Sequence, residues 1–533
     1  MARTLDETLR ESTRDYLAKI DPDNPPSPAQ IKADILDATR LQVQLENVGR
    51  TKGDQWKIPN KLYPIQIAEI MLHLYKIIRI DFAGMVSGED YDMLGLYQTE
   101  GSDIGIYGTD KSQFAKVIHL YDYTITRKGI DEVLSSLKTY APRKQRCMER
   151  DLIAVNNGIF DFKNKVLLPF SPEYVFTAKS RVDYNPNAIN VVIHNNDDNT
   201  DWDVESWIQD LFDDPELAEL TWELLGAILR PNVPWNKSSW FISDTGNNGK
   251  GTLCELMRNL AGEGTYASIP LTAFSKEFHL EPLIKANAVI VDENSVGIFI
   301  DSADNFKAAV TGDVILANRK QKTPVALRFR GMIIECVNEI PRVRDRSVSF
   351  MRRLLFVPFK KCFTGAERKY IKYDYLHRKE VLEYVLFKVM QMDNYELSNP
   401  TACKEMMGEF RVNNDPVAQF VEEILPECKW DLLPNQFLYD LYSAWHKENC
   451  PGSSPLSKKT FLRDIRRVLD KSNVWDCPEV AVKVGQKMNA AEPLIMRYKL
   501  ENWTNPTYKG DDVEKICHPE LSSSYRGIHR RTT

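Results

Sequence analysis

The sequence has no C-x-x-C pair, no long apolar run and no strong excess of either charge. Its nine cysteines are scattered singly through 533 residues, so neither a disulfide framework nor a clustered zinc site is expected. No stretch approaches the roughly 18 apolar residues of a membrane-spanning helix. The first residues, MARTLDETLRESTRDY, lack the apolar core of a secretory signal. We therefore expect a cytoplasmic protein (in a host cell's cytoplasm) with reduced thiols and no membrane contact.

The charge balance excludes an overall basic protein. Lys and Arg number 69 and Asp and Glu number 75, which gives a net charge of −6. Binding to nucleic acid would therefore depend on local basic patches. The hydrophobic fraction of 43% and the charged fraction of 27% exclude a chain that is disordered along most of its length. At about 100–200 residues per domain, two to four domains are expected.

Helical and strand-like patterns alternate before the middle of the chain. An N-cap signal at Ser27 predicts a helix that ends at Gly49. A second helical pattern covers residues 65–80, and a glycine-punctuated strand-like pattern covers residues 91–108. A further helical stretch over residues 204–229 leads into a glycine-rich segment.

That segment, residues 238–262, reads SSWFISDTGNNGKGTLCELMRNLAG: an apolar strand, a Gly/Asn turn and a helix. Backbone N–H groups of such a loop can wrap phosphates, and the helix N-terminus adds a favourable dipole. Lys250 would reach the β- and γ-phosphates, and Thr252 would bind Mg²⁺. The expected nucleotide-binding residues are Gly246, Asn247, Asn248, Gly249, Lys250, Gly251 and Thr252.

The loop departs from the pattern G-x-x-x-x-G-K-[ST] at both ends. Asp244 stands where the first glycine belongs, and Gly251 stands where the Mg²⁺-binding hydroxyl belongs. Thr252, one position later, is the candidate replacement. Taken alone, the loop is also consistent with a Gly-Asn turn that caps a helix.

Two further apolar strands end in polar residues. Residues 288–291 precede Asp292, which would hold Mg²⁺, and Glu293, which would polarise the attacking water. Residues 332–337 precede Asn338, whose amide would sense the γ-phosphate. Each strand alone is consistent with an ordinary strand of the hydrophobic core. The glycine-rich loop, the acidic pair and Asn338, in this order within about a hundred residues, together indicate an ATPase.

The order GNNGKGT, AVIVDEN and IIECVNEIPRVRDRSVSFMRRLLFVPF resembles the superfamily 3 helicases, in the phage, plasmid and poxvirus branch of primase-helicases and replication initiators. Upstream, VNNGIFDFKNKVLLPFSPEY and WIQDLFDDPELAELTWELLGAIL are similar to that branch's preceding module. The resemblance implies an α/β P-loop NTPase core of AAA+-like, superfamily 3 type. It also implies ATP and Mg²⁺ as cofactors and a homo-hexameric ring. The N-G-K-G-T variant occurs in this branch, whereas Asp244 is left without an explanation.

By the same resemblance, Arg352 or Arg353 is an arginine finger that a neighbouring subunit supplies. The sequence leaves open which of the two it is. Such a finger is worth about 10³–10⁵ in rate in well-studied cases. Arg342, Arg344 and Arg346 are weaker candidates, equally consistent with a solvated basic loop.

Residues 313–330 alternate like a hairpin, with Arg319, Lys320 and Lys322 at its tip. Family members carry a DNA-gripping hairpin at this place in the motif order. The alternative for this hairpin is a tip that is merely solvated.

A second basic region follows two helical patterns within residues 415–445. Ser457 is predicted to cap a helix with an apolar stripe, after which residues 480–484 and 494–500 read as strands. This order is that of a winged helix-turn-helix, whose third helix would enter a major groove. A solvated helix or a protein contact is the alternative. The helix's candidate DNA-binding residues are Lys458, Lys459, Arg463, Arg466 and Arg467.

We divide the chain into a mainly helical region (1–95), an α+β/helical module (96–225), a superfamily 3 ATPase/helicase domain (226–412), a winged-helix domain (413–505) and a flexible tail (506–533). The D-x-D in the N-terminal part that could suggest a metal site, Asp90-Tyr91-Asp92, is predicted to be a turn, so primase activity is not expected.

The expected function is an ATP-dependent DNA helicase and replication initiator of a phage, plasmid or mobile genetic element. Its partners would be single-stranded and duplex DNA, including an origin, and other replication proteins. One alternative is a ring NTPase that remodels without unwinding. The other is an origin-binding protein with an inactive ATPase.

Overall fold

The computed structural model describes residues 3–84, 88–243, 245–295, 299–300, 302–343, 345, 347–449, 454–470 and 472–531. The chain forms two compact units, residues 1–404 and 405–533. Helix α13 (Thr401–Asn413) contains the boundary between them. Among the described residues, no helix is both long enough and apolar enough to cross a membrane.

The first unit begins with helices whose ends are set by short polar side chains. The hydroxyl of Ser27 accepts a hydrogen bond from the Gln30 amide, and the helix ends before Gly49, which confirms the predicted helix. Helix α3 packs against α1 and α5 around apolar side chains such as Ile67 and Leu137. The helices are α1 (Leu5–Leu17), α2 (Pro28–Val48), α3 (Pro64–Leu74), α4 (Lys111–Tyr121) and α5 (Arg127–Tyr140).

The prediction of one helix over residues 65–80 is wrong in its second half. Helix α3 ends at Leu74, and the isoleucine-rich residues that follow form a strand, because β-branched side chains fit a half-buried sheet well. This strand belongs to a sheet of order β3-β2-β1-β4. The strands are β1 (Ile77–Asp81), β2 (Met93–Tyr97), β3 (Tyr107–Gly108) and β4 (Arg143–Gln145).

Strand β2 also crosses the domain boundary that we drew between residues 95 and 96. Its hydrogen-bond partners β1 and β3 lie on opposite sides of that boundary in the sequence. The two N-terminal regions therefore share one sheet. The D-x-D segment within it is a turn, as predicted, since residues 89–91 form a short 3₁₀ helix and Asp92 is ion-paired with Arg143 at 2.7 Å.

A meander and two helices precede the central sheet. The stretch predicted as one helix over residues 204–229 is two helices, because Asp214 caps a new start at Pro215. The elements are β5 (Leu152–Val155), β6 (Gly158–Asp161), β7 (Val166–Leu168), β8 (Ile193–Asn195), β9 (Thr200–Trp202), α6 (Val204–Asp210) and α7 (Pro215–Ala227).

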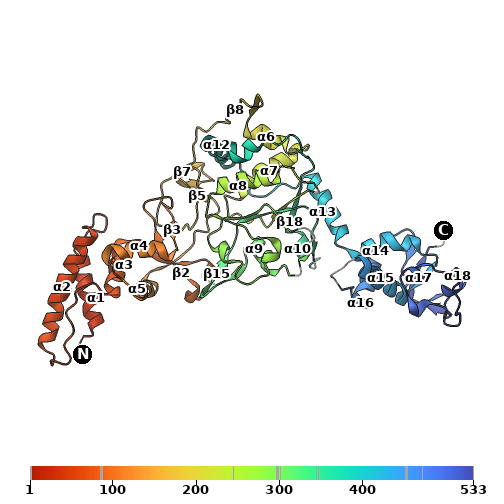
Figure 1. The fold of residues 1–533 in the computed structure, drawn as a ribbon, viewed down its shortest axis with the longest axis horizontal. Helices are drawn as coiled ribbons and strands as arrows, with labels where there is room; N and C mark the ends of the chain where they lie inside the picture. Colours follow the sequence, from red (N-terminus) through yellow and green to blue (C-terminus); the bar gives the residue numbers. More distant parts are fainter. Residues whose placement is uncertain are drawn as a thin grey trace. The chain divides into compact units, whose positions relative to one another are not determined.

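The centre of the first unit is a five-stranded parallel sheet of order β11-β12-β16-β10-β18. Both faces are covered by helices, with α7 and α8 (Lys250–Ala261) on one side and α9 (Asp304–Thr311) and α10 (Val348–Met351) on the other (Figure 1). This arrangement confirms an α/β core of the NTPase kind. The strands are β10 (Ser238–Ile242), β11 (Tyr266–Ala267), β12 (Ala288–Val291), β16 (Met332–Val337) and β18 (Leu354–Pro358).

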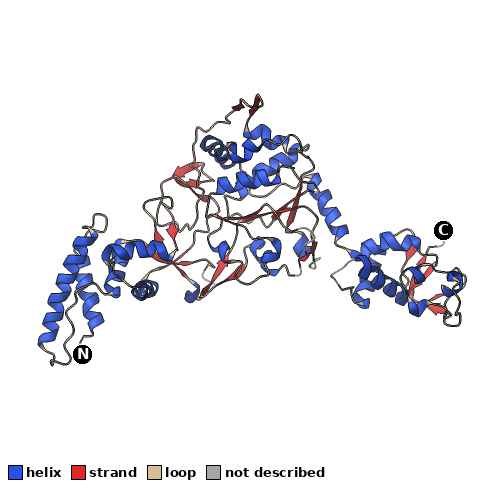
Figure 2. Ribbon diagram, viewed as in Figure 1, coloured by secondary structure: helices blue, strands red, loops and turns tan. Residues whose placement is uncertain are grey.

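Smaller elements complete this unit. Strand β14 pairs antiparallel with β15 to form the predicted hairpin, and β13 pairs with β17. Figure 2 shows these short strands beside the central sheet. Their bounds, with those of the last helices, are β13 (Phe299–Ile300), β14 (Val314–Arg319), β15 (Lys322–Arg328), β17 (Arg342–Val343), α11 (Lys369–Tyr373) and α12 (Lys379–Gln391).

The second unit contains the three predicted helices and two small sheets, β19-β23-β20 and β21-β22. Its apolar core includes Phe420, Trp445, Phe461 and Ile528. The elements are α14 (Pro416–Ile424), β19 (Leu432–Pro434), α15 (Asn435–Asn449), α16 (Lys458–Leu469), β20 (Trp475–Asp476), β21 (Val482–Lys483), α17 (Leu494–Arg497), α18 (Val513–Ile516), β22 (Ser524–Tyr525) and β23 (Gly527–Arg530).

Two predictions for this unit are wrong. Residues 494–500 begin as helix α17 rather than as a strand. Residues 506–533 are not a loose tail, because β23 lies between β19 and β20 and Ile528 is 2% exposed. The alternation in the tail is too short to indicate a strand, and its hydrogen-bond partners are far away in sequence.

We expect Ile528→Asp to destabilise the second unit by about 3–5 kcal/mol, because it would bury an unpaired carboxylate. Limited proteolysis of the full chain should then cleave residues 405–533 faster and leave residues 1–404 resistant. Val513→Asp, at a position that is 52% exposed in the same segment, is the control and should change neither rate. Equal resistance of Ile528→Asp and the wild type would contradict this role of β23.

Candidate functional site

The strand order brings the predicted nucleotide-binding segments to one edge of the central sheet. Strand β16 lies between β10 and β12, and all three run parallel. The residues that follow their carboxyl ends therefore meet at the same edge, where open α/β sheets bind ligands. These residues are the loop 246–252 after β10, Asp292 and Glu293 after β12, and Asn338 after β16.

Lys250 and Asn338 are in direct contact at this edge. The Lys250 ammonium donates a hydrogen bond to Asn338 Oδ1 over 3.1 Å, and Lys250 is 5% exposed. Lys250 is the first residue of α8, and Gly249 before it has φ +86°. A Cβ at residue 249 would also lie 2.6 Å from Leu211 Cδ2, so glycine is required here for two reasons.

The asparagines of the loop brace it from within. Asn248 Nδ2 donates to the Ser243 hydroxyl at 2.6 Å and to the Thr245 carbonyl, and Asn248 is buried. Asn247 Nδ2 donates to Glu367 Oε1 at 3.0 Å. The amide donors of both side chains are therefore engaged, and the groups suited to an anion are the loop's backbone N–H groups and the Lys250 ammonium.

Asp292 is ion-paired with a residue that sequence reasoning missed. Arg258 Nη2, from α8, lies 2.8 Å from Asp292 Oδ1, whose side chain is 42% exposed. Glu293 is exposed at the same edge. No motif spacing indicated Arg258, because it reaches Asp292 only through the packing of α8 against β12.

The oxygen atoms at this edge suit a hard cation that arrives with a nucleotide. The Thr252 hydroxyl and the Asp292 carboxylate are the ligand types that Mg²⁺ prefers alongside phosphate oxygens. Within the described ranges, no group of three or more His, Cys, Asp or Glu side chains is arranged to hold a metal ion by itself. The residues present therefore fit Mg²⁺ bound together with a phosphate ligand.

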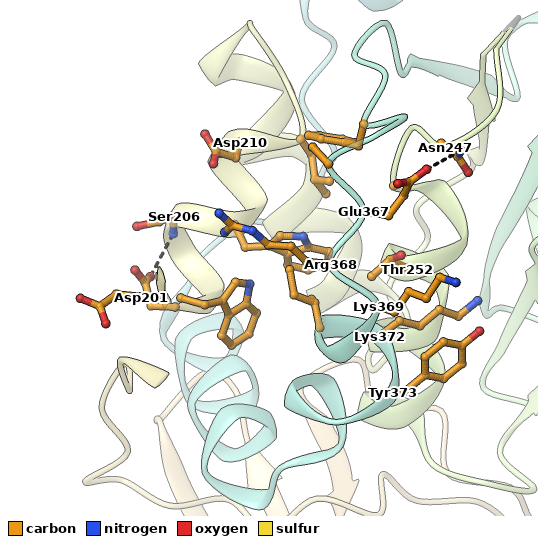
Figure 3. Close-up of a pocket in the computed structure, with 18 residues that line it drawn as sticks. Asp201, Ser206, Asp210, Asn247, Thr252, Glu367, Arg368, Lys369, Lys372 and Tyr373 are labelled. Carbon is orange, nitrogen blue, oxygen red and sulfur yellow. Dashed lines mark hydrogen bonds between the residues drawn. The ribbon is translucent and has the colours of Figure 1, made fainter. Parts of the chain in front are cut away.

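A cavity of about 600 Å³ opens beside the loop. Asn247, Gly249 and Thr252 form one wall, and α6 with residues 363–373 forms the others (Figure 3). Its apolar lining includes Trp207, Leu211, Phe363 and Ile371, and its cationic lining is Arg368, Lys369 and Lys372.

Lys372 is the second residue that sequence reasoning missed. A Cβ built on Gly251 would lie 3.9 Å from its ammonium, so this cation is next to the start of α8. Figure 3 shows Lys369 and Lys372 on the Thr252 side of the cavity. The segment that carries them follows β18, which borders β10 on the side opposite β16 and β12.

The structure distinguishes the two candidate finger arginines. Arg353 is 8% exposed, and its Nη1 donates to the Ser349 hydroxyl at 2.7 Å. Arg352 is exposed, and its described hydrogen bonds are made by its backbone, whose carbonyl accepts from Lys237 Nζ at 2.7 Å and whose N–H donates to the Val348 carbonyl at 3.0 Å. No described contact joins either guanidinium to Lys250 of the same chain. Asp244, Arg344, Arg346 and the side chain of Arg342 lie outside the described residues.

The β14–β15 hairpin exists, but one of its predicted DNA contacts is engaged elsewhere. Arg319 Nε is 3.2 Å from Glu281 Oε1, and the Arg319 side chain is 16% exposed. Lys322 Nζ is 4.0 Å from the same carboxylate and 61% exposed, and Lys320 is exposed at the tip. The hairpin's exposed cations for a DNA contact are therefore the ammonium groups of Lys320 and Lys322.

Helix α16 presents one cationic face. Lys459, Arg463, Arg466 and Arg467 are exposed, opposite the buried stripe of Phe461, Ile465 and Leu469. The Ser457 hydroxyl accepts from the Thr460 amide, as predicted. Arg463 pairs with Asp464, Arg467 is 3.5 Å from Asp415, and Lys458 donates to Gln436. The exposed side chains of Arg463 and Arg467 are nevertheless 75% and 71% accessible.

Three families match successive parts of the chain. The family described as D5 N terminal like matches residues 49–213, and Poxvirus D5 protein-like matches residues 412–496. Between them, a family of unknown function, DUF5906, matches residues 241–353. No curated protein sequence matches the chain.

Solved structures with partial similarity include the apo NrS-1 C-terminal region, A form, with 14% identity over 80% of this chain and 97% of that chain (TM-score 0.41). JCV helicase bound to an acetamide compound has 14% identity over 42% of this chain and 61% of that chain (TM-score 0.24). The two D5-type matches flank the segment whose motif order resembles the same branch. The D5-type matches thus support a primase-helicase relationship over residues 49–213 and 412–496.

Proposed function

We propose that the chain is an ATP-dependent DNA helicase and replication initiator that acts as a homo-hexameric ring on single-stranded DNA. The observation that carries this proposal is the 3.1 Å hydrogen bond between Lys250 and Asn338. It lies at the edge of the sheet where Asp292 and Glu293 follow the end of β12. The D5-type family matches support a replication helicase, and residues 226–412 would be its motor.

In this proposal the loop's backbone N–H groups and the Lys250 ammonium hold the β- and γ-phosphates. Thr252 and Asp292 would hold Mg²⁺, which supplies charge neutralisation at the phosphates when it is bound. Glu293 accepts a proton from the attacking water, and the Asn338 amide donates to a γ-phosphate oxygen. Lys250 would exchange its amide partner for phosphate oxygens as ATP enters.

Arg258 would stabilise the site when no nucleotide is bound. Its guanidinium lies 2.8 Å from the Asp292 carboxylate and pairs with its charge while no metal is bound. Nucleotide binding would release Asp292 from this ion pair. Arg258 is also 3.3 Å from Glu255 on its own helix, which would keep its charge paired after the release.

The cavity beside the loop would receive the nucleoside. The γ-phosphate must point toward Asp292 and Asn338, so the base must extend in the other direction, past β10 toward the segment after β18. That segment and α6 line the 600 Å³ cavity with apolar side chains. Lys369 and Lys372 would then lie beside the α- and β-phosphates.

Arg352 is our candidate for the finger, because it is exposed whereas Arg353 is buried against Ser349. In a ring, this finger would be supplied to the site by a neighbouring copy.

DNA would be held at two places. In the motor, Lys320 and Lys322 of the hairpin tip would contact the backbone of single-stranded DNA. In the second unit, the face of α16 would contact duplex DNA. The three helices and the β19-β23-β20 sheet support a winged helix-turn-helix, with β23 in the place that we had assigned to residues 494–500.

We expect Lys250→Ala to lower DNA-stimulated ATP hydrolysis at least about 100-fold, because a preorganised cation at the phosphates is removed. Phosphate release by the purified chain, with and without single-stranded DNA, is the measurement. Lys163→Ala, at an exposed lysine of the same unit, is the control. Wild-type protein without turnover but with duplex binding would support the alternative of an origin-binding protein with an inactive ATPase.

We expect Arg352→Ala to lower turnover by about 10³-fold or more while nucleotide binding is kept. Mixing Arg352→Ala with Lys250→Ala chains should restore part of the activity, since each copy then supplies what its neighbour lacks. Arg353→Ala should mainly lower thermal stability. Full turnover by Arg352→Ala alone would exclude it as the finger.

We expect the triple change of Lys459, Arg463 and Arg466 to Gln to weaken duplex binding and to reduce the salt dependence by about one ion per lost phosphate contact. Titration of labelled duplex at several salt concentrations measures both. Lys509→Gln, an exposed cation of the same unit, serves as the comparison. An unchanged salt slope would remove α16 from the DNA interface.

A further inference from the structure

A buried polar pair lies directly behind the two acidic residues. Asn294 follows Glu293 and is 4% exposed, and Glu335, in β16, is fully buried three residues before Asn338. Asn294 Nδ2 donates to Glu335 Oε2 at 2.8 Å and to the Cys336 carbonyl at 3.0 Å. The pair thus joins the segment after β12 to the strand that carries Asn338.

The amide of Asn294 is used completely. Both of its N–H groups are directed at β16, and its Oδ1 accepts a hydrogen bond from the Leu271 backbone N–H at 3.1 Å. It therefore fixes three segments that are far apart in the sequence. Asp could supply only acceptors here, and Ala would leave a buried carbonyl and a buried N–H without partners.

Glu335 is an expensive residue for the middle of a buried strand. Its second oxygen, Oε1, has no hydrogen-bond partner among the described residues. Burial raises the pKa of Glu335 well above its usual range. A buried polar group with an unbonded oxygen lowers stability, and an apolar side chain would avoid that cost. Stability alone therefore gives no reason for Glu335.

We propose that Asn294 and Glu335 are positioning residues that hold the peptide after Glu293 in fixed register with the strand that ends in Asn338. This inference rests on the proposed function. Val291, the last residue of β12, is paired with Glu335 in the ladder, and Asn294, three residues later, is bonded back to the same position of β16, so the segment that contains Asp292 and Glu293 is held at both of its ends.

The consequence for the chemistry is that Glu293 and Asn338 keep a fixed position relative to each other. Glu293 is exposed and without a described partner of its own, so its direction is set by the backbone on either side. Asn338 is directed by β16 and by Lys250. The pair keeps the base for water and the amide for the γ-phosphate at one separation, while neither of its members touches the substrate.

The test uses the full chain with single-stranded DNA and compares Asn294→Ala, Glu335→Gln and Glu335→Leu. Asn294→Ala should lower kcat about 10- to 100-fold while the KM for ATP and the affinity for a fluorescent ATP analogue stay within about threefold, as expected for misplacement without lost binding. Glu335→Gln keeps an oxygen acceptor for Asn294 and should retain near wild-type kcat. Glu335→Leu should resemble Asn294→Ala.

Asn305→Ala is the matched control, because Asn305 Nδ2 donates to the Phe274 carbonyl at 2.9 Å and so holds the turn next to Leu271 from another side. It should leave kcat unchanged. Preserved analogue binding shows that a variant is folded. A wild-type kcat in Asn294→Ala, or a loss of kcat in Glu335→Gln as large as in Glu335→Leu, would overturn this inference and leave the proposed function standing. Absence of turnover in the wild type would remove the proposed function and this inference together.

Discussion

The position of β16 between β10 and β12 is the constraint on which the rest of the site depends. A parallel strand has all its carboxyl-end groups at one edge, so inserting β16 between the other two places Asn338 between the phosphate loop and the acidic pair. The Lys250–Asn338 hydrogen bond is the direct result.

Around that edge, the loop's own side chains and two segments distant in sequence hold the loop in one conformation. Asn248 braces the loop through Ser243, Asn247 fixes it to Glu367, and Gly249 lets it turn tightly against Leu211. The loop's backbone N–H groups are thereby directed to one place before any ligand arrives, which lowers the entropy cost of binding an anion.

Local signals in the sequence predicted local structure well. Ser27 and Ser457 are caps whose hydrogen bonds need only the next three residues, so both helix starts were correct. The buried apolar runs at residues 288–291 and 332–337 similarly gave the sheet strands. Their polar ends could be placed at one edge because parallel strands share a direction.

What the sequence did not predict depends on contacts between distant residues. The isoleucines at 77–80 fit helix and strand patterns equally until β2 and β4 supply the ladder. Arg258 and Lys372 reach the site only through helix packing, and Glu335 is a polar residue within an apolar run that periodicity treats as an exception. Strand β23 is recognisable only when both of its partners are known.

The central position of β23 in its sheet also affects how the second unit folds during synthesis. Leu433 of β19 pairs with Ile528, about 95 residues later, so this sheet cannot close until residue 530 has left the ribosome. Until then β19 and β20 each present an open edge on the nascent chain, and closing so long a loop is slow. Helices α14, α15 and α16, whose contacts are local, can pack against one another first, so the basic face of α16 is formed before the sheet.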